Sequence, residues 1–197
     1  MKKTPQQFRR DNVKKLFEKI LKDTQTQLTP VSINIAESVN EDFTKVNLSF
    51  MERTNENSKL LDLKSVKARG FVDGLFTGLK DHYLISYPTL EKIRLVDLTV
   101  SPIAKRGTSL GSDAKANVSF RVLVDKHGEA EFESRSRSVV HSSFTAVLKA
   151  FEFYINCERT FLRLRSILED AQVRNRGDIA ERCMLDLSVL TGVNTYA

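Results

Sequence analysis

The sequence has few of the residues that mark special structural classes. Its 197 residues include two cysteines, four prolines, eight glycines and no tryptophan. This scarcity of proline and glycine excludes a collagen-like or low-complexity chain. Cys157 and Cys183 stand in no Cys-x-x-Cys motif, which predicts reduced thiols rather than a disulfide framework or a zinc site. No apolar run reaches the roughly 20 residues of a membrane span, and the polar stretch after Met1 does not resemble a signal peptide. We therefore expect a cytoplasmic globular protein with no membrane partner.

The positive charge of the chain is concentrated at its beginning. The formal net charge is +6, and the isoelectric point is near 9.3. Residues 1–27 hold eight Lys/Arg and three Asp/Glu, residues 28–157 hold seventeen and sixteen, and residues 158–197 hold six of each, giving +5, +1 and 0. A nearly neutral main body lacks the broad basic surface that favours phosphate binding. We therefore expect no nucleic acid partner for the main body.

The two ends of the chain predict helices. In residues 1–27, apolar residues recur at helical spacing within a predicted amphipathic helix over 5–23, and lysines lie away from this stripe. These lysines form a solvated face or, in the alternative, contact a membrane or nucleic acid. Residues 158–197 predict a helical extension that includes a short helix over 178–189, capped by Asp178.

Residues 28–157 contain an internal repeat. Lys45–Phe50 matches Lys115–Phe120, with Lys, Asn, Ser and Phe identical, and Phe76-Thr77 matches Phe144-Thr145. Each copy shows three stretches of period-two alternation followed by helical spacing. The predicted fold class is α+β: a duplicated βββα unit with two three-stranded antiparallel sheets, flanked by the N-terminal helix and the C-terminal helical extension. Apolar surface left bare by such units predicts a homodimer.

The starts of the two helices in this repeat are candidate binding positions. Helix N-termini present N–H groups and a favourable dipole to a carboxylate, and Gly70 permits close backbone approach. Asp73 and Asp97 provide carboxylates for an ammonium group, so a free amino acid is a ligand class that fits. Each residue also has a structural alternative. These are a turn with positive φ for Gly70, a favourable first-turn acid for Asp73 and a solvated strand edge for Asp97.

The chain shows no constellation of catalytic residues. Its three histidines lack the spacing of a metal site, and no His-x-His pair occurs. The serines near His141 have no Gly-x-Ser-x-Gly elbow, and His127 beside Gly128 is typical of a turn. We expect a protein that is not an enzyme and that uses no metal and no cofactor.

Four short motifs, taken in their order, resemble a known family. Gly70–Gly74 precedes the first predicted helix of the repeat, Leu95–Leu98 lies in the fourth strand, Gly111–Ala114 precedes the fifth, and Ser142-Ser143 lies in the second helix. Over residues 28–157 the chain resembles the C-terminal regulatory (allosteric, dimerisation) domain of 2-isopropylmalate synthase and citramalate synthase.

The resemblance implies a stand-alone regulatory domain for feedback control in branched-chain amino acid biosynthesis, such as leucine biosynthesis. The catalytic barrel of that family is missing, so the implied partner is a separately encoded synthase, unless the protein is a free sensor. A branched-chain amino acid effector would bind near the helix starts, at the interface of a homodimer. The implied effector-binding residues are Gly70, Val72, Asp73, Gly74, Asp97, Leu98, Gly111, Asp113, Ala114, Ser138 and His141.

Two other hypotheses stay open at this point. The chain is a ligand-free dimerisation or interaction module whose basic N-terminal helix contacts a partner or nucleic acid, or it is a fragment of a longer synthase. The start at Met1-Lys2-Lys3 favours a natural beginning over a fragment.

Overall fold

The computed structural model describes residues 5–38, 40–55, 57–103, 115–124 and 128–191. It confirms the predicted α+β fold class, with two three-stranded antiparallel sheets ordered β1-β2-β3 and β4-β5-β6. The elements in chain order are α1 (Pro5–Ile20), the 3-10 turn η1 (Lys22–Thr24), β1 (Thr26–Glu37), β2 (Thr44–Thr54), β3 (Asn57–Ala68), α2 (Phe71–Leu84), the 3-10 turn η2 (Pro88–Lys92), β4 (Ile93–Pro102), β5 (Ala116–Val124), β6 (Gly128–Ser136), α3 (Val139–Val173) and α4 (Gly177–Thr191).

The internal repeat of the sequence occupies equivalent places in the two units. The matching segments Lys45–Phe50 and Lys115–Phe120 lie in β2 and β5, which are the middle strands of their sheets. Phe76 and Phe144 are each the sixth residue of the helix that follows the third strand. Both phenylalanines are buried, and the ring centroid of Phe76 lies 6.1 Å from that of Phe120 in the other unit. The two units therefore share one hydrophobic core.

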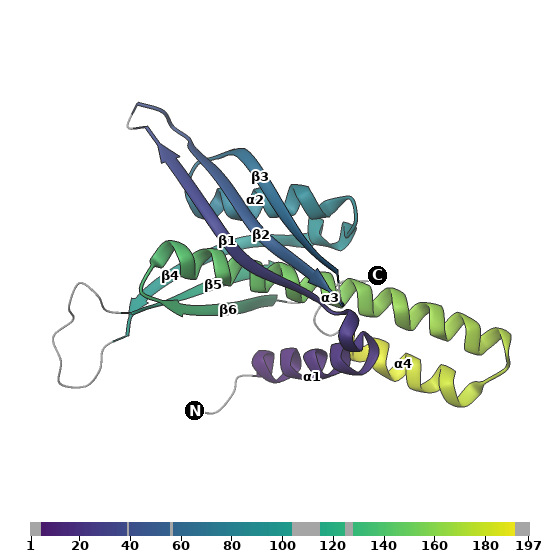
Figure 1. Cartoon of the computed structure of the whole chain (residues 1–197). Coiled ribbons are helices and arrows are strands. Elements are labelled where there is room, and N and C mark those ends of the chain that lie inside the picture. Colours follow the sequence, from purple (N-terminus) through teal and green to yellow (C-terminus); the bar gives the residue numbers. More distant parts are fainter. Residues whose placement is uncertain (1–4, 39, 56, 104–114, 125–127, 192–197) are drawn as a thin grey trace.

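The two helices of the repeat cover different surfaces. Helix α2 packs on β2 and β3, whereas α3 packs on β5, β6 and the edge of β1 (Figure 1). The inward-facing residues of the strands alternate with polar outward-facing ones, as in Val46, Leu48 and Phe50 of β2. Helix α3 therefore holds the two sheets together.

Helices at both ends of the chain pack on α3. Helix α1 buries its predicted apolar stripe, and the ring centroid of Phe17 lies 5.5 Å from that of Phe153. Beyond the sheets α3 projects as a long rod, and α4 folds back against it (Figure 1). The predicted cap Asp178 lies inside the first turn of α4, which begins at Gly177. α1 also ends at Ile20, three residues before its predicted end.

Two further expectations concern the cysteines and membrane-spanning helices. Cys157 and Cys183 are both buried and form no disulfide, in agreement with the prediction from their spacing. Within the described ranges, no helix is both long and apolar enough to cross a membrane.

Candidate functional site

The start of α2 contains four of the predicted effector-binding residues. Gly70 precedes the helix with φ −163° and ψ 164°, so the alternative of a positive-φ turn is wrong. A Cβ built on Gly70 meets no atom within 4 Å, whereas one on Gly74 lies 2.8 Å from Val46 Cγ2. Gly74 is therefore required for packing between α2 and β2. Asp73 is exposed in the first turn, and Val72 is half-buried beside it.

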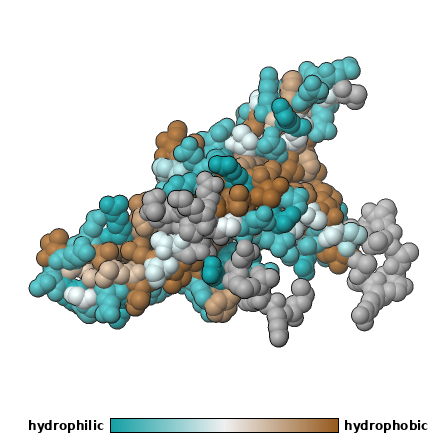
Figure 2. Space-filling model, turned by 180° about the vertical axis from the view of Figure 1, so that it is seen from behind, coloured by the Kyte–Doolittle hydropathy of each residue, from teal (hydrophilic) through white to brown (hydrophobic). Residues whose placement is uncertain are grey.

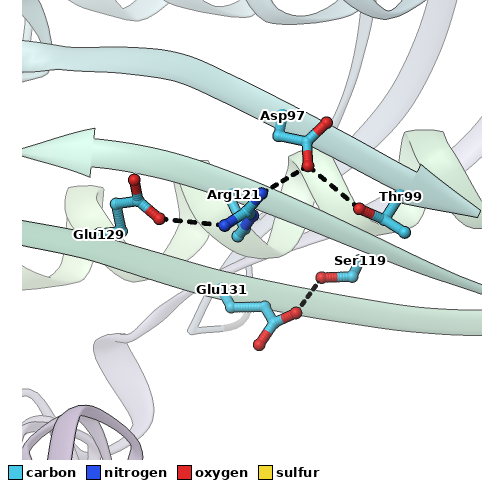
Figure 3. Close-up of polar contacts among 6 residues, drawn as sticks. All are labelled: Asp97, Thr99, Ser119, Arg121, Glu129 and Glu131. Carbon is cyan, nitrogen blue, oxygen red and sulfur yellow. Dashed lines mark hydrogen bonds and ion pairs between the residues drawn. The ribbon is translucent and has the colours of Figure 1, made fainter.

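Asp97 and Leu98 lie on opposite faces of β4, because successive side chains alternate along a strand. Leu98 faces inward opposite Phe120. On the outer face, the Asp97 carboxylate accepts a hydrogen bond of 2.6 Å from Arg121 Nη2 and one of 3.1 Å from Thr99 Oγ1 (Figure 3). The hydrogen bond from Arg121 is the main cause of the lowered pKa of Asp97.

The arginine that binds Asp97 belongs to a wider polar network. Arg121 Nη1 lies 3.3 Å from Glu129 Oε2, and Ser119 donates a hydrogen bond to Glu131 in the same sheet face (Figure 3). The charge of Asp97 is thus already balanced by a side chain of the neighbouring strand. The structure therefore gives this carboxylate an internal partner, Arg121, and a contact of Asp97 with a ligand ammonium stays a prediction.

The start of α3 is capped by its own serines. Ser138 Oγ accepts a hydrogen bond of 3.2 Å from the backbone N–H of His141, which is exposed in the first turn. Ser136 Oγ donates to the carbonyl of Ser138 and lies 2.7 Å from the buried Ser142 Oγ. The remaining predicted residues Gly111, Asp113 and Ala114 lie outside the described residues.

A hollow of about 570 Å³ opens at the end of the first sheet, next to the start of α2. It is polar and mostly acidic, with Arg69 as its basic residue. None of the predicted effector-binding residues lines it. Its lining residues are Glu37, Ser38, Glu41, Asp42, Phe43, Thr44 and Arg69.

A second hollow, which we call the α1–α3 pocket, combines charged and aromatic walls. It has a volume of about 350 Å³ and lies where α1, β6 and α3 meet. This volume is at the lower end of the roughly 300–1,000 Å³ typical of small-molecule sites. Its lining residues are Arg10, Lys14, Phe17, Glu18, Gln25, Phe132, Glu133, Lys149, Glu152, Phe153 and Asn156.

One stripe of α3 builds the floor of the α1–α3 pocket. Lys149, Glu152 and Asn156 are spaced by three and four residues, so their side chains leave the helix on one face. Lys149 Nζ donates to the carbonyl of Glu133 on the edge of β6 at 2.8 Å. Glu152 Oε2 accepts from the N–H of Leu28 on the edge of β1 at 2.9 Å. The stripe thus spans the gap between two strand edges.

Asn156 also binds the edge of β1, because its side-chain amide pairs with the backbone of Thr26 as a neighbouring strand would. Its Oδ1 accepts from the N–H of Thr26, and its Nδ2 donates to the carbonyl of Thr26, both at 2.8 Å. Arg159 Nη1 donates to Thr26 Oγ1 at 2.5 Å. Because unpaired strand edges invite pairing with other chains, these side chains also close the edge of β1.

Burial shifts the pKa of two charged side chains around the α1–α3 pocket. Burial is the main cause of the lowered pKa of Lys14, and it is also the main cause of the raised pKa of Glu152. The Arg10 guanidinium lies 5.0 Å over the ring of Phe132 and donates through Nη1 to the carbonyl of Glu131. Its buried Nε has no hydrogen-bond partner among the described residues.

Sequence reasoning missed the α1–α3 pocket. It placed Lys14 on a solvated face, where the side chain is indeed exposed, but nothing in the local pattern connects Arg10 with Glu131, 121 residues away. The one available signal was the i, i+3, i+7 spacing of Lys149, Glu152 and Asn156 on a helix that is otherwise apolar at this point.

The fold and the pocket define a class of protein rather than a known family. The class is a duplicated βββα domain with a pocket of small-molecule size. Within the described ranges, no group of three or more His, Cys, Asp or Glu is placed to hold a metal ion. No protein-family model and no curated protein matches this chain.

Proposed function

We propose that this protein is a non-catalytic regulatory domain that binds an amino acid effector and acts as a homodimer in the cytoplasm. In this proposal it controls a separately encoded synthase by feedback, as the resemblance of its motifs implies. The observation that carries the proposal is the repeat, because Lys45–Phe50 and Lys115–Phe120 occupy the middle strands of two equivalent βββα units. This is the architecture that the resemblance predicts.

Apolar surface beside β4 supports the homodimer. Helix α3 covers β5 and β6, while β4 is an edge strand whose inward-facing Leu98 is half-exposed and whose Val100 is 44% exposed. Hydrophobic surface is also visible in the middle of the back of the molecule (Figure 2). Burying such surface against a second copy is the ordinary driving force of dimer formation.

Thermal unfolding with added amino acids tests the effector. Leucine, isoleucine or valine at a hundredfold excess over Kd should stabilise the folded protein by about 2.7 kcal/mol, which raises Tm by several degrees at this chain length. Glycine, which lacks the apolar side chain, is the control ligand and should produce a smaller shift. The proposal is overturned if no branched-chain amino acid raises Tm at millimolar concentration.

The non-catalytic part of the proposal has its own assay. The purified chain is incubated with acetyl-coenzyme A and a 2-oxo acid, and the release of free coenzyme A is followed. We expect no release above the rate without protein. A turnover that scales with protein concentration would contradict the proposal.

One observation favours a second candidate, the ligand-free interaction module. A hollow of about 1020 Å³ between the end of α1 and the outer part of α3 has four basic residues in its lining, Lys19, Lys22, Arg159 and Arg163, and one acidic residue, Asp23. Such a surface suits an acidic partner, and its binding would weaken with added salt. A labelled polyglutamate peptide provides the probe. Salt-sensitive binding, together with no response to amino acids, would favour this candidate.

A further inference from the structure

We infer that the effector binds in the α1–α3 pocket, and that it is a zwitterionic α-amino acid with an apolar side chain. This inference rests on the proposed function but moves the binding site away from the helix starts. The pocket offers three kinds of wall, which match the three parts of such a ligand: cationic, acidic and aromatic.

Arg10 and Lys14 are the residues of the α1 side of the pocket that would recognise a carboxylate. The ring of Phe132 and the carbonyl of Glu131 hold the Arg10 guanidinium in place, and its Nε remains a buried donor without a partner among the described residues. A buried donor left unpaired is costly, so a ligand oxygen that accepts from it is favoured. Burial lowers the pKa of Lys14, and a nearby carboxylate would favour its charged form.

Glu152 is the acidic residue of the α3 stripe that would recognise an ammonium group. One of its oxygens, Oε2, accepts from the N–H of Leu28, and the second oxygen of the carboxylate can accept from a ligand ammonium. Burial raises the pKa of this carboxyl, which the hydrogen bond from Leu28 and the charges of Lys14 and Lys149 only partly offset, and a ligand ammonium would further favour its charged form. A simple anion such as phosphate would gain nothing from Glu152, so the mixed charges favour a zwitterion.

Aromatic rings form the wall for the ligand side chain. The ring centroid of Phe153 lies 5.5 Å from that of Phe17 and 5.8 Å from that of Phe132. Each aliphatic carbon buried against such a wall adds roughly 0.8 kcal/mol, which favours leucine or isoleucine over alanine. A volume of about 350 Å³ suits a free amino acid. It is small for a dinucleotide.

Calorimetric titration with L-leucine tests the pocket with two variants and matched controls. Glu152→Gln keeps an oxygen for the N–H of Leu28 but loses the charge, and Lys14→Gln removes a cation. We expect each to weaken leucine binding tenfold or more, since a charged hydrogen bond contributes that much. The controls Glu169→Gln and Lys15→Gln change exposed residues of the same helices and should bind as the wild type does.

A second ligand separates a direct contact from a structural effect. 4-Methylpentanoic acid is leucine without its ammonium group, and it should bind the wild type at least tenfold more weakly. In Glu152→Gln this difference between the two ligands should largely disappear, because the carboxylate that recognises the ammonium is gone. The unliganded melting curve of each variant shows that it is folded before it is titrated.

The possible results distinguish the inference from the proposed function. If leucine binds the wild type and both pocket variants equally well, the inference is overturned while the proposed function stands. Asp73→Asn, at the start of α2, would then be the variant expected to weaken binding. If no branched-chain amino acid binds the wild type, the proposed function fails, and the inference fails with it.

Discussion

Gly70 and Gly74, both predicted to bind the effector, differ in whether a larger residue would fit at their positions. Gly70 has an extended backbone and open space around its Cβ position, so other residues fit there. Gly74 faces the fully buried Val46, and Gly78 faces Val66, where an added Cβ would lie 3.0 Å away. The two helical glycines therefore let α2 approach the first sheet closely.

The Gly74→Ala substitution sets two effects against each other. Alanine favours a helix over glycine by about 1 kcal/mol, whereas forcing a methyl group into a filled core costs about 1–3 kcal/mol. Because Val46 is fully buried and its Cγ2 would lie 2.8 Å from the new methyl group, we expect a net loss of about 1 kcal/mol, measured by urea unfolding. In a Val46→Ala background the clash is absent, and the same substitution should instead stabilise the protein.

The control for this experiment is Gly70→Ser. Serine is a favoured N-cap and fits the extended backbone at this position, so the free energy of unfolding should stay within about 0.5 kcal/mol of the wild type. If Gly74→Ala has the same effect in both backgrounds, close packing of α2 on β2 does not explain the glycine.

Helix α3 is the element that joins the two units. Its face toward the second sheet is apolar, while the stripe of Lys149, Glu152 and Asn156 makes hydrogen bonds to the edges of β1 and β6. These bonds replace the pairing that a fourth strand would provide. The same helix continues without a break from the repeat into the C-terminal extension.

Asn156→Ala should show how much the hydrogen bonds between α3 and the edge of β1 contribute to the free energy of unfolding. The substitution leaves the N–H and the carbonyl of Thr26 without partners, and Thr26 is only 1% exposed. Since each buried unsatisfied group costs about 1–3 kcal/mol, we expect a loss of about 2 kcal/mol or more in urea unfolding. Asn34→Ala, at an exposed position of the same strand, is the control and should change stability by less than about 0.5 kcal/mol. Equal effects would mean that the edge contact adds no stability.

At the scale of the whole molecule, we expect a homodimer formed through β4. Light scattering at micromolar concentration should give about 45 kDa, twice the 22.4 kDa of one chain. Val100→Glu places a charge on the half-exposed inner face of β4, and it should raise the dimer dissociation constant at least tenfold, because an unpaired buried charge opposes association.

Val31→Glu is the matched control for the dimer. Val31 is 56% exposed on β1, against 44% for Val100 on β4, and it lies in the other sheet. The control should remain dimeric. A wild-type mass of one chain would contradict the dimer, and dissociation of both variants would place the interface elsewhere.

Much of the fold was predictable from the sequence because it depends on short-range patterns. Alternation predicted the strands, helical spacing predicted the helices, and the match between Lys45–Phe50 and Lys115–Phe120 predicted two equivalent units. These signals are local, since one face of each element must be apolar to form the core. Only details at the ends differed, such as Asp178, which lies inside α4 rather than at its cap.

Which residues are neighbours in the candidate site depends on the tertiary structure. The sequence suggested Asp97 for a ligand ammonium, but folding places Arg121 of the next strand 2.6 Å from its carboxylate. Likewise, Asn156 contacts Thr26 across 130 residues, and Arg10 contacts Glu131 across 121. The sequence alone determined which residues are apolar and at what period, which is enough for the elements. Which charges become neighbours depends on how the elements pack, because a polar side chain carries no local signal of the partner it will have.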